Sequence, residues 1–155
     1  MYTGPILTVF WSIVAAGLRC TLANSAYNAR ELAYQYNDSG ALLILTSEEG
    51  LSIARETLLN VGFSDDQVDR RIIVLGSSLG WAGGPTFPRR HEAGGLVHME
   101  DLLKLGTLTE EEKFDGGMAH ETLYLCYSSG TLALHISCPR ILILIDQALR
   151  GSPRV

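Results

Sequence analysis

A hydroxyl-rich loop follows an apolar run near the end of the sequence. Residues 122–126 (TLYLC) have the apolar, aromatic and β-branched composition of a buried strand, and Ser128, Ser129, Gly130 and Thr131 follow after one tyrosine. A turn of this kind can aim backbone N–H groups and hydroxyls at one point, an arrangement that binds anions such as phosphate. Plain turns have the same composition, so this interpretation needs support from elsewhere in the chain.

Few other side chains stand in a pattern that catalysis requires. His98 and His120 lie beside Glu100 and Glu121 but beside no positioned nucleophile, so we interpret both as surface or helix-capping histidines. The sequence has no G-x-S-x-G turn for a hydrolase nucleophile, and the acidic run 110–112 is typical of a solvated face. The sequence therefore assigns no catalytic residue.

Six segments carry a more specific pattern: Val9 to Gly17 (VFWSIVAAG), Asn24 to Tyr27 (NSAY), Glu31 to Gln35 (ELAYQ), Asp38 to Ala41 (DSGA), Asp101 to Leu103 (DLL) and Tyr127 to Thr131 (YSSGT). In this order, over residues 6–131, they resemble the N-terminal part of the adenylate-forming (AMP-binding) acyl-CoA ligases. The resemblance is closest to the 4-coumarate-CoA ligase-like branch and its fungal relatives, some of which serve secondary metabolite biosynthesis.

The resemblance implies a reaction. In the family, a carboxylic acid, aromatic or fatty, attacks ATP with the help of magnesium to give an acyl-adenylate, and CoA then displaces AMP. By resemblance, Ser128, Ser129, Gly130 and Thr131 belong to the loop that holds the ATP phosphates. ATP and magnesium are the implied cofactors, CoA is the implied co-substrate, and a small carboxylic acid is the implied partner.

The sequence departs from the family at this loop. The family continues as Thr-Gly-x-Pro-Lys-Gly, whereas this chain continues as LALHI over 132–136, and no lysine follows Lys113. We therefore expect residues 1–131 to be a partial AMP-binding domain, truncated at both ends, and residues 132–155 to be a divergent tail from a frameshift, a retained intron or a gene-model error. Without the loop lysine and the C-terminal lid, the chain alone is not expected to be a ligase.

Two alternatives come from other classes. One is a non-catalytic remnant that binds a protein partner through exposed sheet edges. The other is a small secreted protein, because residues 5–18 are apolar and uncharged. That run is shorter than the ~20 residues that span a bilayer, and no basic segment precedes it, so a core helix is favoured over a membrane span or a signal peptide.

Composition and cysteine spacing narrow the class of protein. The 155 residues are 46% hydrophobic and 19% charged, which is typical of a globular chain, and the net charge of −5 argues against nucleic acid or an anionic membrane as a partner. The three cysteines, Cys20, Cys126 and Cys138, match neither a zinc motif nor a disulfide framework. We interpret Cys20 and Cys126 as small buried hydrophobic residues and the compartment as cytoplasmic.

Helical periodicity predicts three helices that would support the loop. The first covers residues 5–18, with the inner stripe Leu7, Phe10, Trp11, Val14 and Leu18. The second begins at the capping pair Asn28 and Glu31 and turns Leu32 and Tyr36 inward. The third begins at Ser47 or Glu48 and ends at Gly62, with the inner stripe Leu51, Ala54, Leu58 and Leu59.

Short apolar runs predict strands at 19–23, 41–46, 71–76 and 122–126. Residues 65–70 are interpreted as a connector, 77–95 as a surface loop, 99–105 as a short helix and 109–113 as an acidic turn. This rhythm predicts an α/β fold, with a partial parallel sheet, flanking helices and right-handed βαβ units, as part of the large N-terminal domain of the ligase fold. In the tail, a helix over about 139–149 is favoured, and a strand at 141–145 is the alternative.

Overall fold

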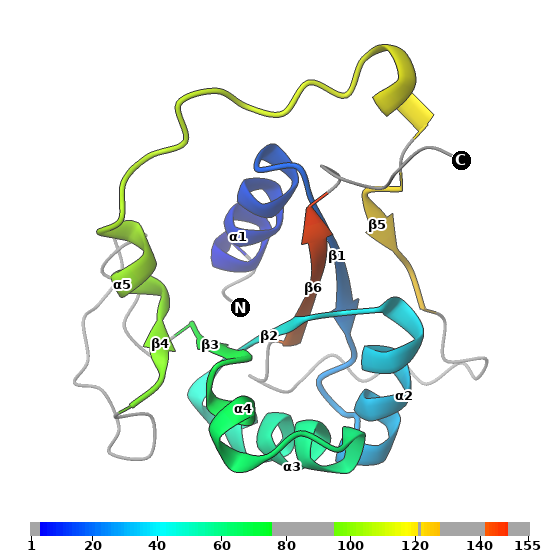
Figure 1. The fold of residues 1–155 in the computed structure, drawn as a ribbon, viewed down its shortest axis with the longest axis vertical. Helices are drawn as coiled ribbons and strands as arrows, with labels where there is room; N and C mark the ends of the chain where they lie inside the picture. The colour runs from blue at the N-terminus through cyan, green and yellow to red at the C-terminus, as the bar shows by residue number, and fades with distance from the viewer. Residues whose placement is uncertain (1–3, 76–94, 121, 128–141, 149–155) are drawn as a thin grey trace.

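The computed structural model describes residues 4–75, 95–120, 122–127 and 142–148 (Figure 1). The helices and strands in chain order are α1 (Gly4–Ala15), β1 (Leu18–Ala23), α2 (Ala29–Ser39), β2 (Leu43–Thr46), η1 (Glu48–Gly50), α3 (Leu51–Val61), α4 (Asp65–Asp69), β3 (Ile72–Val74), β4 (Val97–His98), α5 (Met99–Leu103), η4 (Gly116–His120), β5 (Tyr124–Leu125) and β6 (Leu142–Ala148).

The described strands form one six-stranded sheet in the order β4-β3-β2-β6-β1-β5. β2, β3 and β4 pair in parallel, and so do β1 and β5. β6 lies antiparallel between β1 and β2, so those two strands point the same way (Figure 1). The α/β class predicted from the sequence is confirmed, and the sheet is mixed because one antiparallel strand stands among five parallel ones.

Helices cover both faces of the sheet, which gives three layers (Figure 1). On one face, α2, α3 and α4 pack through Leu32, Leu58 and Val68 against Ile44 and Ile72. On the other face, α1 packs against the neighbouring positions of the same strands; this second cluster is Val9, Ile13, Val14, Cys20, Leu45 and Leu75. Successive strand residues therefore enter opposite cores, as the pleat of a doubly covered sheet requires.

The second helix begins as its sequence predicts. The side chain of Asn28 accepts hydrogen bonds from the backbone N–H groups of Arg30 and Glu31, both at 3.0 Å, and Glu31 Oε2 accepts from the Asn28 N–H at 3.0 Å. Gly40 ends the helix in the left-handed region with φ 68°. Leu32 and Tyr36 are buried, which confirms the predicted inner face.

The third helix is also confirmed, with one error in its stripe. A short 3-10 turn, Glu48–Gly50, leads into α3, and Gly62 ends it with φ 106°. Leu51, Ala54 and Leu58 are buried, but Leu59 is 46% exposed. The stripe of this short helix is narrow because the sheet covers only one side of it, so a position about 100° away from Leu58 faces solvent.

The first helix is shorter than predicted and its stripe is rotated. It ends at Ala15, where Gly17, at φ 71°, turns the chain directly into β1, so Leu18 belongs to the strand. Val9, Ile13 and Val14 are buried, whereas Trp11 is 63% exposed. The aromatic residues of the helix contact each other instead: the Phe10 ring lies edge to face with the rings of Trp11 and Tyr124, at centroid distances of 5.3 and 5.4 Å.

Two other predicted segments differ from the structure, and a third makes a contact that the sequence did not indicate. The helix favoured in the tail is wrong, because residues 142–148 form strand β6 between two strands distant in sequence. The connector at 65–70 contains a helical turn, α4, whose start is fixed by the Ser64 N–H donating to Gln67 Oε1 at 3.1 Å. The acidic turn is docked at the end of α1, since the Glu112 N–H donates to the Ala15 carbonyl at 2.8 Å.

The predicted surface loop at 77–95 and the predicted domain boundary at residue 131 lie outside the described residues, apart from Gly95. The predicted strands at 41–46, 71–76 and 19–23 correspond to β2, β3 and β1. The predicted helix at 99–105 is α5, which ends at Leu103.

Candidate functional site

The carboxyl ends of the parallel strands lie on one side of the sheet, and a ligand site is expected on that side. From β1 the chain passes through β2 and β3 to β4 in one direction along the sheet, and β5 then lies on the other side of β1. The order of the strands therefore reverses between β1 and β5. In open α/β sheets, ligands bind outside the carboxyl ends of the strands at such a reversal point.

β5 ends on this side of the sheet, and the predicted phosphate loop comes next in the sequence. Ser128, Ser129, Gly130 and Thr131 themselves lie outside the described residues, and Tyr127 is the last described residue before them. The strand that leads to them is shorter than the predicted 122–126: only Tyr124 and Leu125 pair with β1. The backbone bond from the Cys20 N–H to the Leu123 carbonyl, at 3.2 Å, begins this contact.

A buried side-chain relay fixes β5 to its neighbours. The Thr21 hydroxyl donates to the Leu125 carbonyl at 2.6 Å, and it accepts a hydrogen bond from Gln35 Nε2 at 3.0 Å. Gln35 Nε2 also lies 3.3 Å from the Leu22 carbonyl. Thr21 and Gln35 are both 2% exposed, so these bonds are sheltered from water. The relay joins α2, β1 and β5 immediately before the predicted loop.

A second contact from the same helix holds the residue next to the loop. The Tyr127 hydroxyl donates to Asp38 Oδ2 at 2.6 Å. Loss of solvation, and then the neighbouring carboxylate of Asp38, raise the pKa of the Tyr127 phenol to about 12, so the hydroxyl keeps its proton at neutral pH. Gln35 and Asp38 are three residues apart on α2 and therefore share a face of the helix.

The start of α2, which follows β1 at the same edge, is a poor site for an anion. Asn28 already occupies the first backbone donors, as described above, and the Glu31 carboxylate places negative charge beside them. Asn24, directly after β1, uses its side-chain oxygen to accept from the Ala26 N–H at 3.0 Å. The loop after β5, rather than the helix after β1, is thus the anion-binding candidate.

Polar residues at the ends of β2 and β4 are also buried. Thr46 is fully buried, and Ser47, Glu48 and His98 are 7%, 7% and 1% exposed. His98 occupies the N-cap of α5, with its N–H 3.4 Å from Asp101 Oδ2, and His120 is exposed, so the prediction that each is a surface or helix-capping histidine is confirmed. The apolar run 41–46 gave no sign that Ser47 and Glu48, directly after it, are buried.

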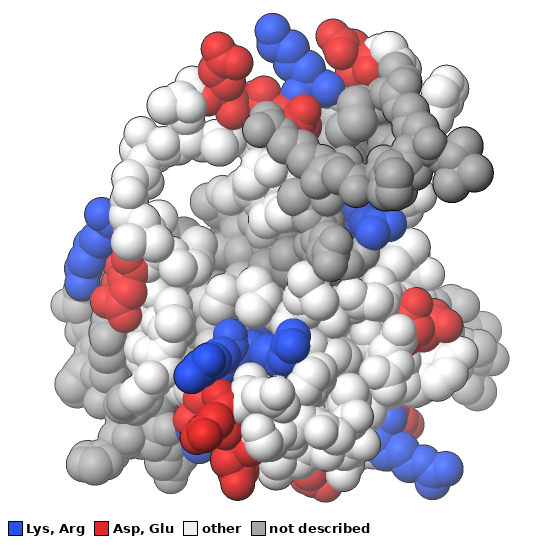
Figure 2. Space-filling model, in the orientation of Figure 1, with Lys and Arg blue, Asp and Glu red and all other residues white. Residues whose placement is uncertain are grey.

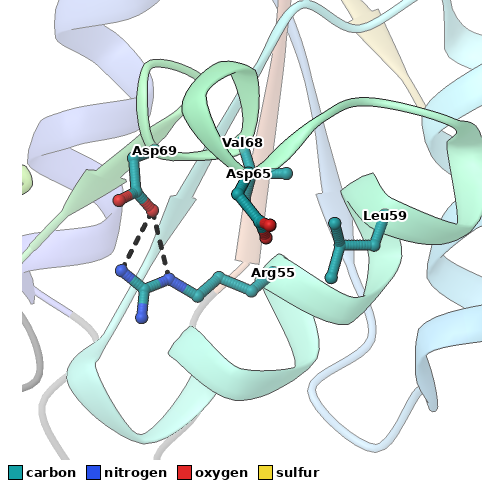
Figure 3. A pocket seen from close by; sticks show the side chains of 5 residues that line it. All are labelled: Arg55, Leu59, Asp65, Val68 and Asp69. Carbon is teal, nitrogen blue, oxygen red and sulfur yellow. Dashed lines mark hydrogen bonds and ion pairs between the residues drawn. The ribbon is translucent and has the colours of Figure 1, made fainter.

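A shallow pocket of 270 Å³ lies between α3 and α4 (Figure 3). Arg55 directs its guanidinium at Asp69, with Nε and Nη2 at 3.2 and 2.9 Å from the same carboxylate oxygen. Leu59, Asp65 and Val68 complete its lining. Because the arginine is already paired and two carboxylates stand beside it, the pocket has the charge pattern of a surface ion pair rather than an anion site.

Among the described residues, the thiols and charged side chains form no second candidate site. Burial raises the pKa of the Cys20 thiol to about 11, in accord with the predicted buried hydrophobic role, whereas Cys126 is exposed and that prediction is wrong for it. Over the described residues, no three His, Cys, Asp or Glu side chains cluster as metal ligands. Basic side chains lie against acidic ones at several places on the face in Figure 2.

The phosphate loop predicted from the sequence lies outside the described residues, and the sequence did not indicate which residues hold the strand before it. Thr21, Gln35 and Asp38 form no recognisable motif, although Gln35 and Asp38 belong to the resembling segments ELAYQ and DSGA. Gln35 bonds to Thr21, which in turn bonds to Leu125 of β5, and Asp38 bonds to Tyr127, the residue before the loop. In the part of the chain that the structure describes, no helix has the length and apolarity needed to cross a membrane. Comparison with family models, curated proteins and solved structures finds no match for this chain.

Proposed function

We propose that the chain is the N-terminal part of an acyl-CoA ligase-like domain that binds the phosphates of ATP but does not complete the ligase reaction. One observation carries the proposal: β5 ends beside β1 where the strand order reverses, and the residues predicted to bind phosphate follow directly. The hydrogen bonds of Thr21 to Leu125 and of Tyr127 to Asp38 hold this strand in place before the loop and support the proposal.

The residues of the loop fit the phosphate part of a nucleotide. Ser128, Ser129 and Thr131 supply hydroxyl donors, and Gly130 allows the backbone to approach closely. Donors of this kind bind a triphosphate without transferring it. The proposed site therefore takes ATP with its magnesium ion.

Turnover requires more than this loop supplies. Charge that develops on phosphate oxygens must be neutralised by preorganised donors, and each such donor is worth about 3 to 4 kcal/mol of the barrier. No lysine follows Lys113 in the sequence. The loss of the loop lysine alone would lower kcat by about 10²- to 10³-fold. We therefore assign the chain nucleotide binding and no ligase activity of its own, so CoA and the acid are substrates of the family rather than of this chain.

Thermal unfolding with and without MgATP tests the proposal. At ten times its dissociation constant, a ligand stabilises the folded state by about 1.4 kcal/mol, which raises Tm by about 3 to 6 °C for a chain of this size. We expect the double variant Ser128→Ala/Ser129→Ala to lose the shift and Ser52→Ala, on the exposed side of α3, to keep it. The absence of any shift in the unaltered chain would refute binding, and pyrophosphate release above blank would refute the assigned inactivity.

The alternative is a protein-binding remnant that uses the edges of the sheet. Among the described strands, the outermost are β4 and β5, and each is only two residues long. β6 covers the inner edges of β1 and β2. Edges this short offer few unpaired backbone groups to a partner strand, so nucleotide binding is the better supported function.

A further inference from the structure

β6 separates two strands that are aligned with each other. It pairs with β1 along one edge and with β2 along the other, and the two pairings place residues in four common rows. Written as β1, β6 and β2, the rows are Cys20, Ile145 and Leu43; Thr21, Leu144 and Ile44; Leu22, Ile143 and Leu45; and Ala23, Leu142 and Thr46. β1 and β2 are thus parallel and in register, with one strand between them.

The faces of the two strands also agree row by row. Cys20 and Leu43 both belong to the cluster that packs against α1. In the next row, Ile44 packs against α2 and α3, and Thr21 is bonded to Gln35 of α2. A shift of one residue in register would move every side chain to the opposite face. The four rows contain no such shift, since the irregularity in the pairing of β1 with β6 lies before them, between Leu18 and Cys20. Direct pairing of β1 with β2 would leave each side chain on the face that it already occupies.

The connection between the strands suits direct pairing as well. β1 and β2 are joined through α2, the type of crossover that joins adjacent parallel strands. If β6 left the sheet, the backbone groups that it now satisfies on β1 and on β2 would find partners on each other. The remaining order, β4-β3-β2-β1-β5, would be parallel throughout.

We propose that β6 is a displaceable strand and that the chain has two sheet arrangements. In one, β6 lies between β1 and β2, as in this structure. In the other, β6 is released and β1 pairs directly with β2 in the register Cys20 to Leu43, Thr21 to Ile44, Leu22 to Leu45 and Ala23 to Thr46. This is a conformational switch built from backbone pairing, and it does not depend on nucleotide binding.

A single engineered cysteine reports which arrangement is present. With β6 in place, Cys20 and residue 43 are two strand spacings apart, about 10 Å between Cα atoms, which exceeds the ~7 Å limit for a disulfide. After direct pairing they are one spacing apart, about 5 Å, within reach of a disulfide. The variant Leu43→Cys, in the full chain with Cys126→Ser and Cys138→Ser, therefore leaves Cys20 as the sole possible partner.

Proline displaces the strand without shortening the chain. Leu144→Pro removes a ladder N–H in the centre of β6, where proline is not accommodated, and Leu144→Val is the matched control that keeps the strand. Ile44→Cys is the second control, because residue 44 lies on the face opposite to Cys20. Cross-linking is driven by diamide at alkaline pH, since the buried Cys20 thiol has a pKa of about 11.

We expect at least about tenfold more disulfide between Cys20 and the thiol introduced at position 43, measured by mass spectrometry, in Leu43→Cys/Leu144→Pro than in Leu43→Cys or Leu43→Cys/Leu144→Val. The proline variant should keep its far-UV circular dichroism and a cooperative unfolding transition. Loss of that transition would overturn the proposal, because β6 would then be indispensable to the fold. A folded proline variant without the disulfide, or equal cross-linking in Ile44→Cys/Leu144→Pro, would overturn it too.

Discussion

Replacement of Thr21 by valine tests how the approach to the candidate site is held. Valine has nearly the shape of threonine, so the change removes the hydroxyl without leaving a cavity. Two bonds are lost: the one to the Leu125 carbonyl at 2.6 Å and the one from Gln35 at 3.0 Å. Gln35 Nε2 keeps its 3.3 Å contact with the Leu22 carbonyl, which limits the loss. At ~0.5 to 1.5 kcal/mol for each bond, we expect about 1 to 2 kcal/mol of destabilisation.

The matched control is Thr57→Val. Thr57 is also fully buried, and its hydroxyl lies 3.3 Å from the Ala29 carbonyl between α2 and α3, away from β5. Denaturant and thermal unfolding should show a fall in Tm of about 2 to 8 °C for Thr21→Val and a smaller fall for Thr57→Val. If Thr21 positions the strand before the phosphate loop, Thr21→Val should also reduce the Tm shift produced by MgATP, and Thr57→Val should not.

Two results would refute this reasoning. Equal MgATP shifts in both variants would mean that the relay contributes to stability only and does not position the loop. No measurable loss of stability in Thr21→Val would mean that water or another group replaces the hydroxyl, contrary to its 2% exposure.

The remaining predictions concern α2 and its contact with Tyr127. Asn28→Ala removes the acceptor for two backbone N–H groups and should destabilise the chain by about 1 kcal/mol in urea unfolding, whereas Asn60→Ala, at an exposed position of α3, should change stability by less than ~0.5 kcal/mol. The raised pKa of Tyr127, about 12, means that its contribution is complete below the unfolded value of ~10 and is lost as pH rises from about 10 to 12. Tm should fall less steeply over this range in Tyr127→Phe than in the unaltered chain, and identical slopes would contradict the assignment.

Local chemistry made the start of α2 predictable from sequence. The Asn28 and Glu31 pair closes hydrogen bonds within three residues, so no distant partner is needed to fix it. The short apolar run of β2 was predictable for a similar reason, since a strand covered on both faces needs no polar position. The interactions that start α2 join residues close in sequence, and those that bury β2 need only an apolar partner on each face.

Elements whose structure depends on residues distant in sequence were not predicted correctly. Residues 142–148 have an apolar spacing compatible with a helix, and they become a strand because β1 and β2 offer aligned edges on both sides. Trp11 and Leu59 have the spacing of a buried helical stripe, but both are exposed because the sheet covers a narrower face of each helix than the stripe predicts. Likewise, the contact between Tyr127 and Asp38 joins residues 89 positions apart, and neither residue type indicates it.

The two proposals place different demands on the two edges of β1, which is why they can fail separately. One edge carries β5 and, through it, the approach to the candidate phosphate loop. The other carries β6, whose displacement exchanges one set of backbone partners for another. Thr21 lies in a row with Leu144 on the β6 side, but its hydroxyl bonds to Leu125 on the β5 side and to Gln35 in the helix layer. Release of β6 leaves both of those side-chain bonds in place, so a site between β1 and β5 is compatible with either arrangement of the sheet.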